Sequence, residues 1–514
     1  MNINYHNERT SLLRRAFLDA ESPKALLVVN AGAAILYFFV LCFVFPIGNS
    51  VLFGLLVFGE VFHLWQVLTF LYTVWDTSYA PPQDDSYQPG VDVFITVCGE
   101  EREIVEKTAR AALDMDYPDF AVHILNDGYV AHKENWHEME ELAHGLGINC
   151  ITRQIPGGAK AGNINHAATV TRKPIIVIFD ADYMPHRDFL RKTTPYFVDP
   201  LVGFVQTPQY YKNWAANYVT RSSWEQQELF YGAICKGKNR LNAAIMCGTN
   251  MLISRAALQS VGGMNTVSIA EDSVTGLFMH ARGWRSVYVP EVLAEGLATE
   301  DLLSYSNQQF RWARGNLDIL FRYNPFFMRG LTFAQRIQYL SSASFFLSGP
   351  IVVIDALLPI VFFFSGLVPV HVSGMLLALV FLPYFFLTLY VIERSSNWSF
   401  TFESLGFSMG VFAIHVRALV ATLLRRKSAF SVTPKAAQTG NFIMLAKWHI
   451  AYLLLALVGM SIALAREGVS ASFINNTAWV AVNSAAFLPF IRASLPQRRA
   501  QRAAEPAAQL ELAQ

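Results

Sequence analysis

Pro174-Ile175-Ile176-Val177-Ile178-Phe179-Asp180-Ala181-Asp182 is an apolar run that ends abruptly in two carboxylates. A short run of this kind, rich in β-branched residues, is typical of a buried strand. Two carboxylates one residue apart at a strand end can bind a hard divalent cation, because Mg²⁺ prefers a few carboxylates plus substrate phosphates. A lone Asp-x-Asp is also compatible with a solvated turn, so the rest of the chain has to decide between the two interpretations.

Upstream of this run, predicted strands alternate with predicted helices. The strands are at residues 91–97, 120–126 and 150–153, and the helices are at residues 100–115, 136–145 and 160–171. Such alternation predicts a mostly parallel sheet, whose ligands bind at the carboxyl ends of the strands. Asp127 ends one strand, and Asp180 and Asp182 end another. We therefore expect these three carboxylates at one edge of the sheet.

Three further motifs carry polar chemistry. Gly157-Gly158-Ala159-Lys160-Ala161-Gly162-Asn163 is flexible and cationic, which suits close approach to a phosphate. Ala270-Glu271-Asp272 places two carboxylates before a predicted helix, and a carboxylate can deprotonate an acceptor hydroxyl. Gln308-Gln309-Phe310-Arg311-Trp312 combines amides, a guanidinium that can bind diphosphate, and an indole that suits a sugar face.

The composition predicts a mixture of membrane and soluble parts. The chain has 514 residues, of which 53% are hydrophobic, and a net charge of +1 that argues against a nucleic-acid partner. Five scattered cysteines without a Cys-x-x-Cys pair argue against a disulfide scaffold or a zinc site. Six apolar runs approach the roughly 20 residues that a membrane-spanning helix needs. They are residues 25–45, 51–75, 341–367, 372–392, 448–465 and 471–491.

The basic residues predict the orientation of these spans. The short links within pairs of spans contain Arg466 as their one Lys or Arg, whereas the opposite side is rich in both. The positive-inside rule therefore places both termini and the long insert in the cytoplasm, which predicts a multi-pass protein of the inner membrane. Glu60, His63 and Asp355 fall within predicted spans. Ionisable residues there are either functional or satisfied inside the bundle or near an interface.

Together these motifs resemble the processive family 2 membrane glycosyltransferases, particularly the cellulose synthase-like branch. The family signature D, DxD, (T)ED and Q(Q/R)xRW is represented here by Asp127, Asp180-Ala181-Asp182, Glu271-Asp272 and Gln308-Gln309-Phe310-Arg311-Trp312. The stretches GAKAGN (158–163), VQTPQ (205–209), CGTN (247–250) and FSVTPK (430–435) match as well. The resemblance covers roughly residues 91–440. It implies an α/β GT-A (Rossmann-like) cytoplasmic domain inserted in an α-helical transmembrane bundle of about six spans.

The resemblance also implies a role for each matching residue. The general base would be Asp272, supported by Glu271, and the cation would be Mg²⁺ (or Mn²⁺), held by Asp180 and Asp182. The nucleotide-sugar would be bound by Asp127, Lys160, Asp180, Arg311, Thr433 and Lys435. The acceptor would be bound by Gln308, Trp312, Cys247 and Gly248.

The domain boundaries follow from the spans and motifs. We expect an N-terminal tail with two spans at residues 1–78 and the glycosyltransferase domain at 79–330. An interfacial helix with two spans follows at 331–399, then a second interfacial helix, over residues 400–424, with the FxVTxK gating loop at 400–441. The last two spans lie at 442–493 and a cytoplasmic tail at 494–514.

The function implied by the resemblance is a hexosyltransferase that polymerises glucose from UDP-glucose into a β-glucan and translocates it. Its partners would be the UDP-sugar, the growing glycan, the bilayer and accessory export subunits. Ala270 replaces the usual Thr and Gln309 the Arg of bacterial cellulose synthase, so curdlan or mixed-linkage synthesis fits about as well. The alternatives are a chitin or hyaluronan synthase-like enzyme that uses UDP-N-acetylglucosamine, a non-processive transferase acting on a lipid carrier, and a transporter or scaffold with a degenerate transferase domain.

Overall fold

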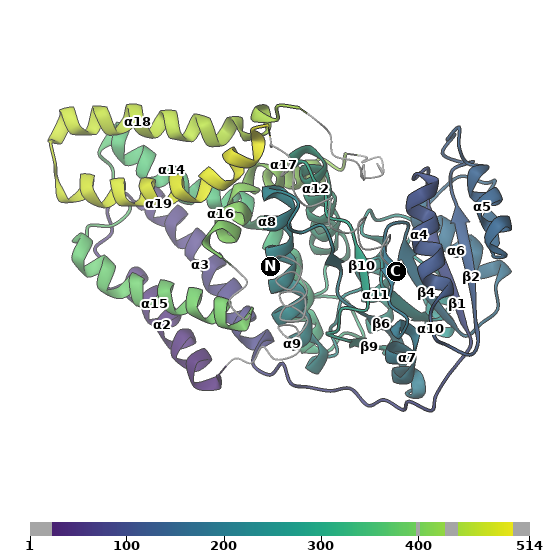
Figure 1. Ribbon diagram of the computed structural model, residues 1–514. Coiled ribbons are helices and arrows are strands. Elements are labelled where there is room, and N and C mark those ends of the chain that lie inside the picture. Colours follow the sequence, from purple (N-terminus) through teal and green to yellow (C-terminus); the bar gives the residue numbers. More distant parts are fainter. Residues whose placement is uncertain (1–22, 397–400, 427–439, 497–514) are drawn as a thin grey trace, which may run out of the picture.

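The computed structural model describes residues 23–396, 401–426 and 440–496. An α/β domain lies at one end of the molecule and a bundle of long helices at the other (Figure 1). The gating-loop motif at 430–435, with Thr433 and Lys435, and the C-terminal tail beyond residue 496 lie outside the described residues. The predicted domain boundaries stay a prediction.

The α/β domain is built on a mixed seven-stranded sheet. Its first four strands are parallel, β8 runs antiparallel to both β4 and β6, and β6 and β9 are parallel again. In spatial order the strands are β3 (Asn149–Thr152), β2 (Phe120–Asn126), β1 (Val91–Val97), β4 (Ile175–Asp180), β8 (Met251–Ser254), β6 (Val202–Gln206) and β9 (Arg285–Tyr288). The mostly parallel sheet is therefore confirmed, with β8 as an antiparallel strand that the sequence did not predict.

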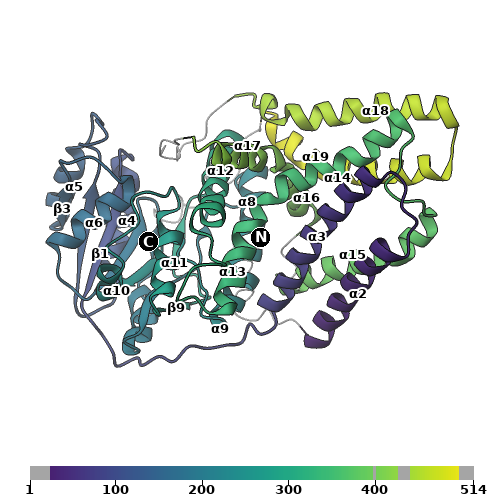
Figure 2. The same cartoon turned by 180° about the vertical axis from the view of Figure 1, so that it is seen from behind.

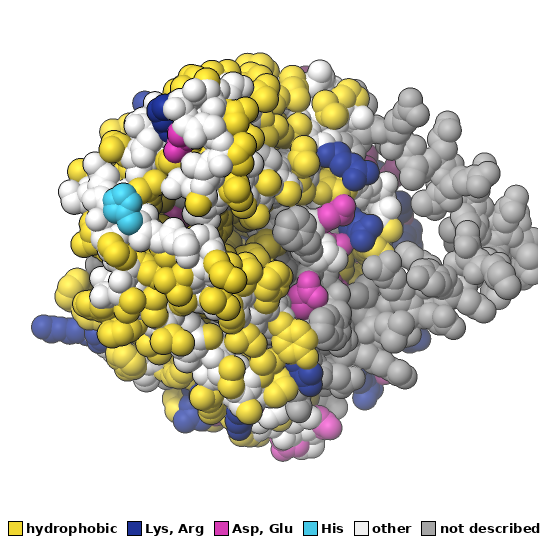
Figure 3. Space-filling view, turned by 90° about the vertical axis from the view of Figure 1, so that its left-hand side faces the viewer, with side chains coloured by type: hydrophobic (Ala, Val, Ile, Leu, Met, Phe, Trp, Pro, Cys, Tyr) yellow, Lys and Arg dark blue, Asp and Glu magenta, His cyan; other side chains and the backbone are white. Residues whose placement is uncertain are grey.

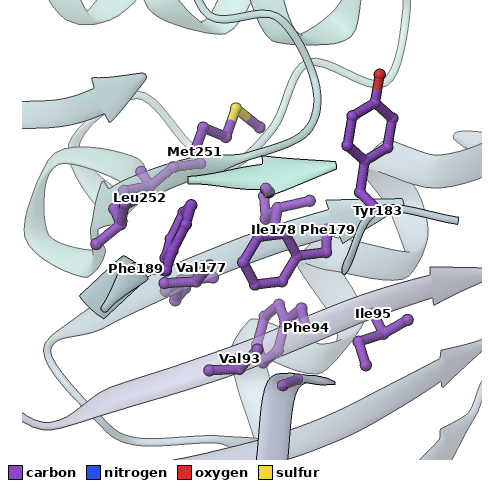
Figure 4. Close-up of a cluster of buried hydrophobic side chains, with 14 of the residues drawn as sticks. Val93, Phe94, Ile95, Val177, Ile178, Phe179, Tyr183, Phe189, Met251 and Leu252 are labelled. Atoms are coloured by element: carbon purple, nitrogen blue, oxygen red, sulfur yellow. The ribbon is translucent and has the colours of Figure 1, made fainter. Parts of the chain in front are cut away.

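The centre of the sheet is covered on both faces. Phe94, Ile178, Phe179 and Phe189 are fully buried, and Phe179 packs edge-on against Phe189 with ring centroids 4.9 Å apart (Figure 4). Burial on both faces explains why β1 and β4 are mostly apolar along their length rather than alternating. The helices of the first half are α4 (Arg102–Leu113), α5 (Glu138–Leu146), α6 (Ala159–Val170) and α7 (Phe189–Thr193).

The second half of the domain adds a small sheet and the helices that lead toward the bundle. The small sheet contains β5 (Met184–Pro185), β10 (Ala294–Gly296) and β7 (Tyr210–Tyr211). The helices are α8 (Tyr218–Glu228), a π-helical turn (Leu229–Ile234), α9 (Cys235–Arg240), α10 (Arg255–Ser260), α11 (Glu271–Ala281), α12 (Leu302–Asp318) and α13 (Phe333–Ser344). Seen from behind, α13 leads from this domain toward α3 and α14 (Figure 2).

Each of the six predicted spans forms a helix. They are α2 (Lys24–Phe43), α3 (Ser50–Thr73), α14 (Ser348–Ser365), α15 (Gly374–Ser395), α18 (Lys447–Glu467) and α19 (Ala471–Ser494). By length and hydropathy, six helices among the described residues could cross a membrane, but this set includes Glu403–Leu423 in place of α19. Asn475, Asn476 and Asn483 make α19 less apolar than the sequence-based count assumed.

The helix expected at residues 400–424 is two helices, α16 (Phe402–Gly410) and α17 (Phe412–Leu423). Helix α17 packs along α12 of the α/β domain, where the guanidinium of Arg417 lies 4.4 Å from the centre of the Phe310 ring. Ala418 is buried in the same contact with Ala313 and Leu317. Helix α17 is therefore covered on one side by the α/β domain, and its predicted position at the membrane boundary stays a prediction.

The long helices form a closed arrangement. Helix α2 packs against α3 and α15, α3 against α14, α14 against α18 and α19, and α15 against α19. Hydrophobic side chains cover most of the bundle end of the molecule, and charged ones are few there (Figure 3). This surface is what a protein exposes to lipid.

Candidate active site

The two aspartates that follow β4 lie at the carboxyl edge of the sheet. Asp180 Oδ1 accepts a hydrogen bond from Thr96 Oγ1 at 3.3 Å and forms an ion pair with Lys160. The backbone N–H of Asp180 donates to Thr249 Oγ1 at 2.9 Å. Asp182 is 3% exposed, and its Oδ2 accepts from the backbone N–H of Leu297 at 3.4 Å. Both carboxylates are therefore held in place by neighbouring strands and loops.

Lys160 joins this carboxylate edge to a second loop. It lies in the first turn of α6, after Gly157 and Gly158, whose φ angles of 129° and 69° are readily adopted only by glycine. Its Nζ donates to Asp180 and to the backbone oxygen of Gly248 at 2.7 Å. Burial alone would lower the pKa of Lys160, but the surrounding carboxylates raise it above its ordinary value. Lys160 is therefore a fixed positive charge, as a phosphate site requires.

The loop that contains Gly248 is held by the earlier VQTPQ stretch. The backbone N–H of Cys247 donates to Gln206 Oε1 at 2.8 Å, and Gln209 Nε2 donates to the backbone oxygen of Cys247 at the same distance. These bonds fix both sides of Cys247. The VQTPQ stretch (205–209) and the CGTN stretch (247–250), which are separate in the sequence, thus form one structural unit.

Gly248 is the point where the donor side of the site meets the expected base. A Cβ atom added to Gly248 would lie 2.8 Å from Asp272 Oδ2 and 3.8 Å from Lys160 Nζ. Its φ of 83° also favours glycine. The missing side chain therefore leaves the space that the Asp272 carboxylate and the Lys160 ammonium share.

Asp272 lies in the first turn of α11, where its Oδ1 accepts from the backbone N–H of Ser273 at 2.6 Å. Burial raises the pKa of Asp272, although the backbone N–H of Ser273 and the Lys160 charge oppose the increase. The pKa of Glu271 is raised as well, by burial and by the adjacent Asp272. A carboxylate whose pKa is raised is a stronger base, which suits removal of a proton from a hydroxyl group.

Helix α12 brings the last motif to the same site. Gln308, Arg311 and Trp312 are spaced i, i+3 and i+4, so they share one face of the helix. Burial lowers the pKa of Arg311, while the charges of Asp180 and Glu271 oppose that decrease. Arg311 therefore interacts electrostatically with Asp180 and Glu271, as Lys160 does. Phe310 contacts Arg417 of α17 instead.

Arg153 is a site residue that the sequence analysis missed. Its Nε and Nη2 donate to the two oxygens of Asp127 at 2.9 and 2.7 Å, and Nη2 also reaches the backbone oxygen of Ala159 at 3.2 Å. Burial raises the pKa of Asp127, while Arg153 opposes that increase. Arg153 therefore ties the end of β2 to the start of the Lys160 loop. A basic residue between a strand and a glycine-rich stretch was the signal that could have identified it.

The donor set at the DxD motif fits a hard divalent cation. Among the residues that the structure describes, no group of three or more His, Cys, Asp and Glu side chains is placed to hold a metal. Asp180 and Asp182 offer carboxylate oxygens alone, at one strand end. A cation that takes its other ligands from water and from substrate phosphates suits such a partial shell.

Comparison with known sequences agrees with this arrangement. Residues 89–315 match the glycosyltransferase-like family 2 and residues 259–444 match the cellulose synthase family. The chain is 33% identical over 426 residues to putative cellulose synthase 2 of Komagataeibacter xylinus, which covers 78% of this chain and 27% of that protein. It is 32% identical over 434 residues to the UDP-forming cellulose synthase catalytic subunit of Pseudomonas fluorescens SBW25, covering 80% and 57%.

The chain therefore contains a family 2 glycosyltransferase domain and is similar to the cellulose synthases. The chain spans about a quarter to just over half of the length of these relatives, at 27% and 57%. Among solved structures, a mannosyltransferase from Pyrobaculum calidifontis in complex with GDP-Man and Mn²⁺ has a TM-score of 0.53 and 18% sequence identity. The alignment covers 73% of this chain and 100% of the mannosyltransferase chain. That likeness confirms the GT-A fold expected for a family 2 glycosyltransferase.

Proposed function

We propose that this chain is a membrane enzyme that polymerises glucose from UDP-glucose into a β-glucan and passes the product across the inner membrane. The observation that carries the proposal is the shared space at Gly248, where the Asp272 carboxylate and the Lys160 ammonium approach each other. A base beside a phosphate-binding cation is what glycosyl transfer from a nucleotide-sugar requires. The relatives on the cellulose synthase-like branch support glucose as the sugar.

The donor would occupy the edge formed by Asp127, Asp180 and Asp182. Lys160 and Arg311 supply positive charge for the diphosphate, and a guanidinium can bind two phosphate oxygens at once. Asp180 and Asp182 would hold Mg²⁺ (or Mn²⁺), which when bound neutralises negative charge on the leaving diphosphate. Thr433 and Lys435 of the FxVTxK stretch would add donor contacts.

The transfer step would use Asp272 as the general base. Its carboxylate accepts the proton of an acceptor hydroxyl while that oxygen forms a bond to the anomeric carbon of the donor sugar. The bond from the anomeric carbon to the diphosphate oxygen breaks, and UDP leaves with the electron pair. A single displacement inverts the anomeric centre, so an α-linked donor gives a β-linked product. Glu271 would support Asp272 from the adjacent position.

The acceptor end of the glycan would lie against Trp312 and Gln308, near the loop of Cys247 and Gly248. An indole face packs against the C–H face of a sugar ring, and an amide bonds to its hydroxyl groups. The elongated product would then enter the helical bundle next to α12. In this orientation the α/β domain and both termini are cytoplasmic, and accessory export subunits would receive the product.

Product analysis tests this function. Purified protein in lipid with Mg²⁺ would be offered labelled UDP-glucose and UDP-N-acetylglucosamine separately, and the product would be digested with linkage-specific glucanases. We expect a high-molecular-weight product from UDP-glucose alone, with a digestion pattern that names the linkage. Polymer from the N-acetylated donor alone would contradict the β-glucan assignment and favour a chitin or hyaluronan synthase-like enzyme. A short, lipid-linked product would contradict processivity.

A further inference from the structure

A polar cluster lies deep in the helical bundle, far from the active-site motifs in sequence. Glu60 and His63 are one turn apart on α3, and Asp355 is on α14. His63 Nε2 lies 2.9 Å from Asp355 Oδ2, and the hydroxyl of Tyr37 on α2 donates to Glu60 Oε1 at 2.9 Å. Three helices therefore contribute to one cluster in the apolar part of the chain.

The cluster faces the inside of the bundle. The ring of Tyr37 stacks on Tyr384 of α15, with centroids 5.3 Å apart and planes 13° apart, so a fourth helix lies beside it. A Cβ atom added to Gly59 would lie 2.8 Å from Asp355 Oδ1, which shows how closely α3 and α14 approach. The enclosure is completed where α15 packs against α19.

Protein atoms nevertheless do not fully cover the side chains of this cluster. The side chains of His63 and Asp355 are 39% and 33% exposed, although both lie within spans. An ionisable group at membrane depth is costly in lipid, so it faces protein or a water-filled space. The surrounding helices leave a third or more of these two side chains uncovered, which leaves room beside them for water or a ligand.

The charges of this space select a particular kind of ligand. In α2, α3, α14, α15, α18 and α19, every Lys and Arg lies within a few residues of a helix end. At mid-depth the fixed groups are therefore two carboxyls and one imidazole. Carboxylate and imidazole groups bond well to hydroxyls, whereas an anionic polymer would meet repulsion that low-dielectric surroundings strengthen.

A line of polar contacts connects the cluster with the α/β domain. Along α3, the indole N–H of Trp65 donates to Ser344 Oγ at 2.9 Å, and Thr69 Oγ1 lies 2.9 Å from Ser341 Oγ. Further along, Thr73 bonds to Gln338, whose backbone oxygen accepts from Lys238 Nζ at 3.3 Å. The polar face of α3 thus runs from the cluster toward the catalytic side of the molecule.

We propose that Glu60, His63 and Asp355 form a hydrated subsite that binds hydroxyl groups of a neutral sugar polymer as it passes through the bundle. This inference rests on the proposed function, because it takes the product of the active site as its ligand. It goes further in placing the product against the α3–α14 wall and in disfavouring polymers that contain uronic acid.

Cysteine accessibility tests the subsite in the full-length protein in proteoliposomes. His63→Cys would be treated with a charged methanethiosulfonate reagent, and labelling would be corrected for the five native cysteines by using the unsubstituted protein. Phe58→Cys is the matched control, because Phe58 is on the same helix and is 59% exposed on an apolar surface. Glu60→Cys replaces His63→Cys in the same assay if the latter does not fold.

We expect at least about tenfold faster labelling at residue 63 than at residue 58, because a charged reagent needs a hydrated path. Labelling should then decrease several-fold after incubation with UDP-glucose and return after the vesicles are opened with detergent and treated with glucanase. Labelling no faster than at residue 58 would overturn the hydrated subsite, and this arm needs no donor. Unchanged labelling in protein that makes polymer would overturn product binding. Absence of polymer from the unsubstituted protein would instead contradict the proposed function.

Discussion

The active site and the membrane cluster hold their charges in different ways. In the active site, Lys160 pairs with Asp180, 20 residues along the chain, and both belong to motifs that the sequence displays. In the membrane cluster, His63 pairs with Asp355, 292 residues away, and neither lies in a motif. The first cluster contains cations and suits an anionic diphosphate, whereas the second contains neither Lys nor Arg and suits neutral hydroxyls. The proposed donor site thus differs from the proposed product subsite in having Lys and Arg side chains beside its carboxylates.

Replacing the general base of the active site should cause the largest loss of turnover. Asp272→Asn removes the proton acceptor and keeps the shape, so we expect turnover to fall by about 10² to 10⁴-fold. UDP affinity, measured by titration on the same preparation, should change little because Asp127, Lys160 and Arg311 remain. Substantial remaining turnover would show that another group removes the proton.

Filling the space at Gly248, which Asp272 and Lys160 share, should cause the next largest loss of turnover. Gly248→Ala places a Cβ 2.8 Å from Asp272 Oδ2 and strains a φ of 83°. Displacing a catalytic group by about 1 Å can cost about 100-fold in rate, so we expect a loss of that order in initial-rate assays. Gly145→Ala is the control, since nothing lies within 4 Å of a Cβ there. Equal activity of the two variants would contradict the crowding described at Gly248.

Arg153→Ala tests the buried pair that the sequence analysis missed. The side chains of Arg153 and Asp127 are 7% and 8% exposed, and leaving one buried charge without its partner costs about 3–5 kcal/mol of folding free energy. We expect a marked decrease in thermal stability together with weaker UDP binding. Arg110→Ala, which breaks the exposed pair with Glu106, should cost only about 0.3–0.5 kcal/mol. Similar stability losses in both variants would contradict a special role for Arg153.

The smallest expected effect is on the pH dependence of turnover. The base must be ionised, and burial raises the pKa of Asp272 above the ordinary value of about 3.9. Activity should therefore be present above the raised pKa and be lost as pH falls through it, at a higher pH than for an ordinary carboxyl group. The rate profile of the unsubstituted protein checks this, with UDP binding measured at each pH. An acid limb near pH 4 would contradict a buried base.

In the α/β domain, strands and site residues could be predicted where the sequence contains a local pattern or motif. The predicted strands at 91–97 and 120–126 match β1 and β2, because strands that are largely buried are mostly apolar. Strand β8 was missed because its antiparallel direction depends on pairing with β4 and β6, which no local pattern records. Asp127, Asp180 and Asp272 were found through motifs, whereas Arg153 acts through a bidentate contact that only the fold creates.

The membrane half was predictable in its spans and less so in its contacts. Glu60, His63 and Asp355 could be singled out because ionisable residues are rare in apolar runs. Their pairing could not, since it depends on how α3 and α14 approach at Gly59. The break at Val411 between α16 and α17 was also hidden, because both helices are apolar, although α16 packs on α19 and α17 on α12.

In the function proposed above, the active site and the membrane bundle are successive parts of one path. Sealed vesicles with the α/β domain facing outward, given labelled UDP-glucose and Mg²⁺, test this directly. We expect labelled polymer that added glucanase digests only after the vesicles are opened with detergent. Polymer that is fully digested while the vesicles remain sealed would contradict passage through the bundle.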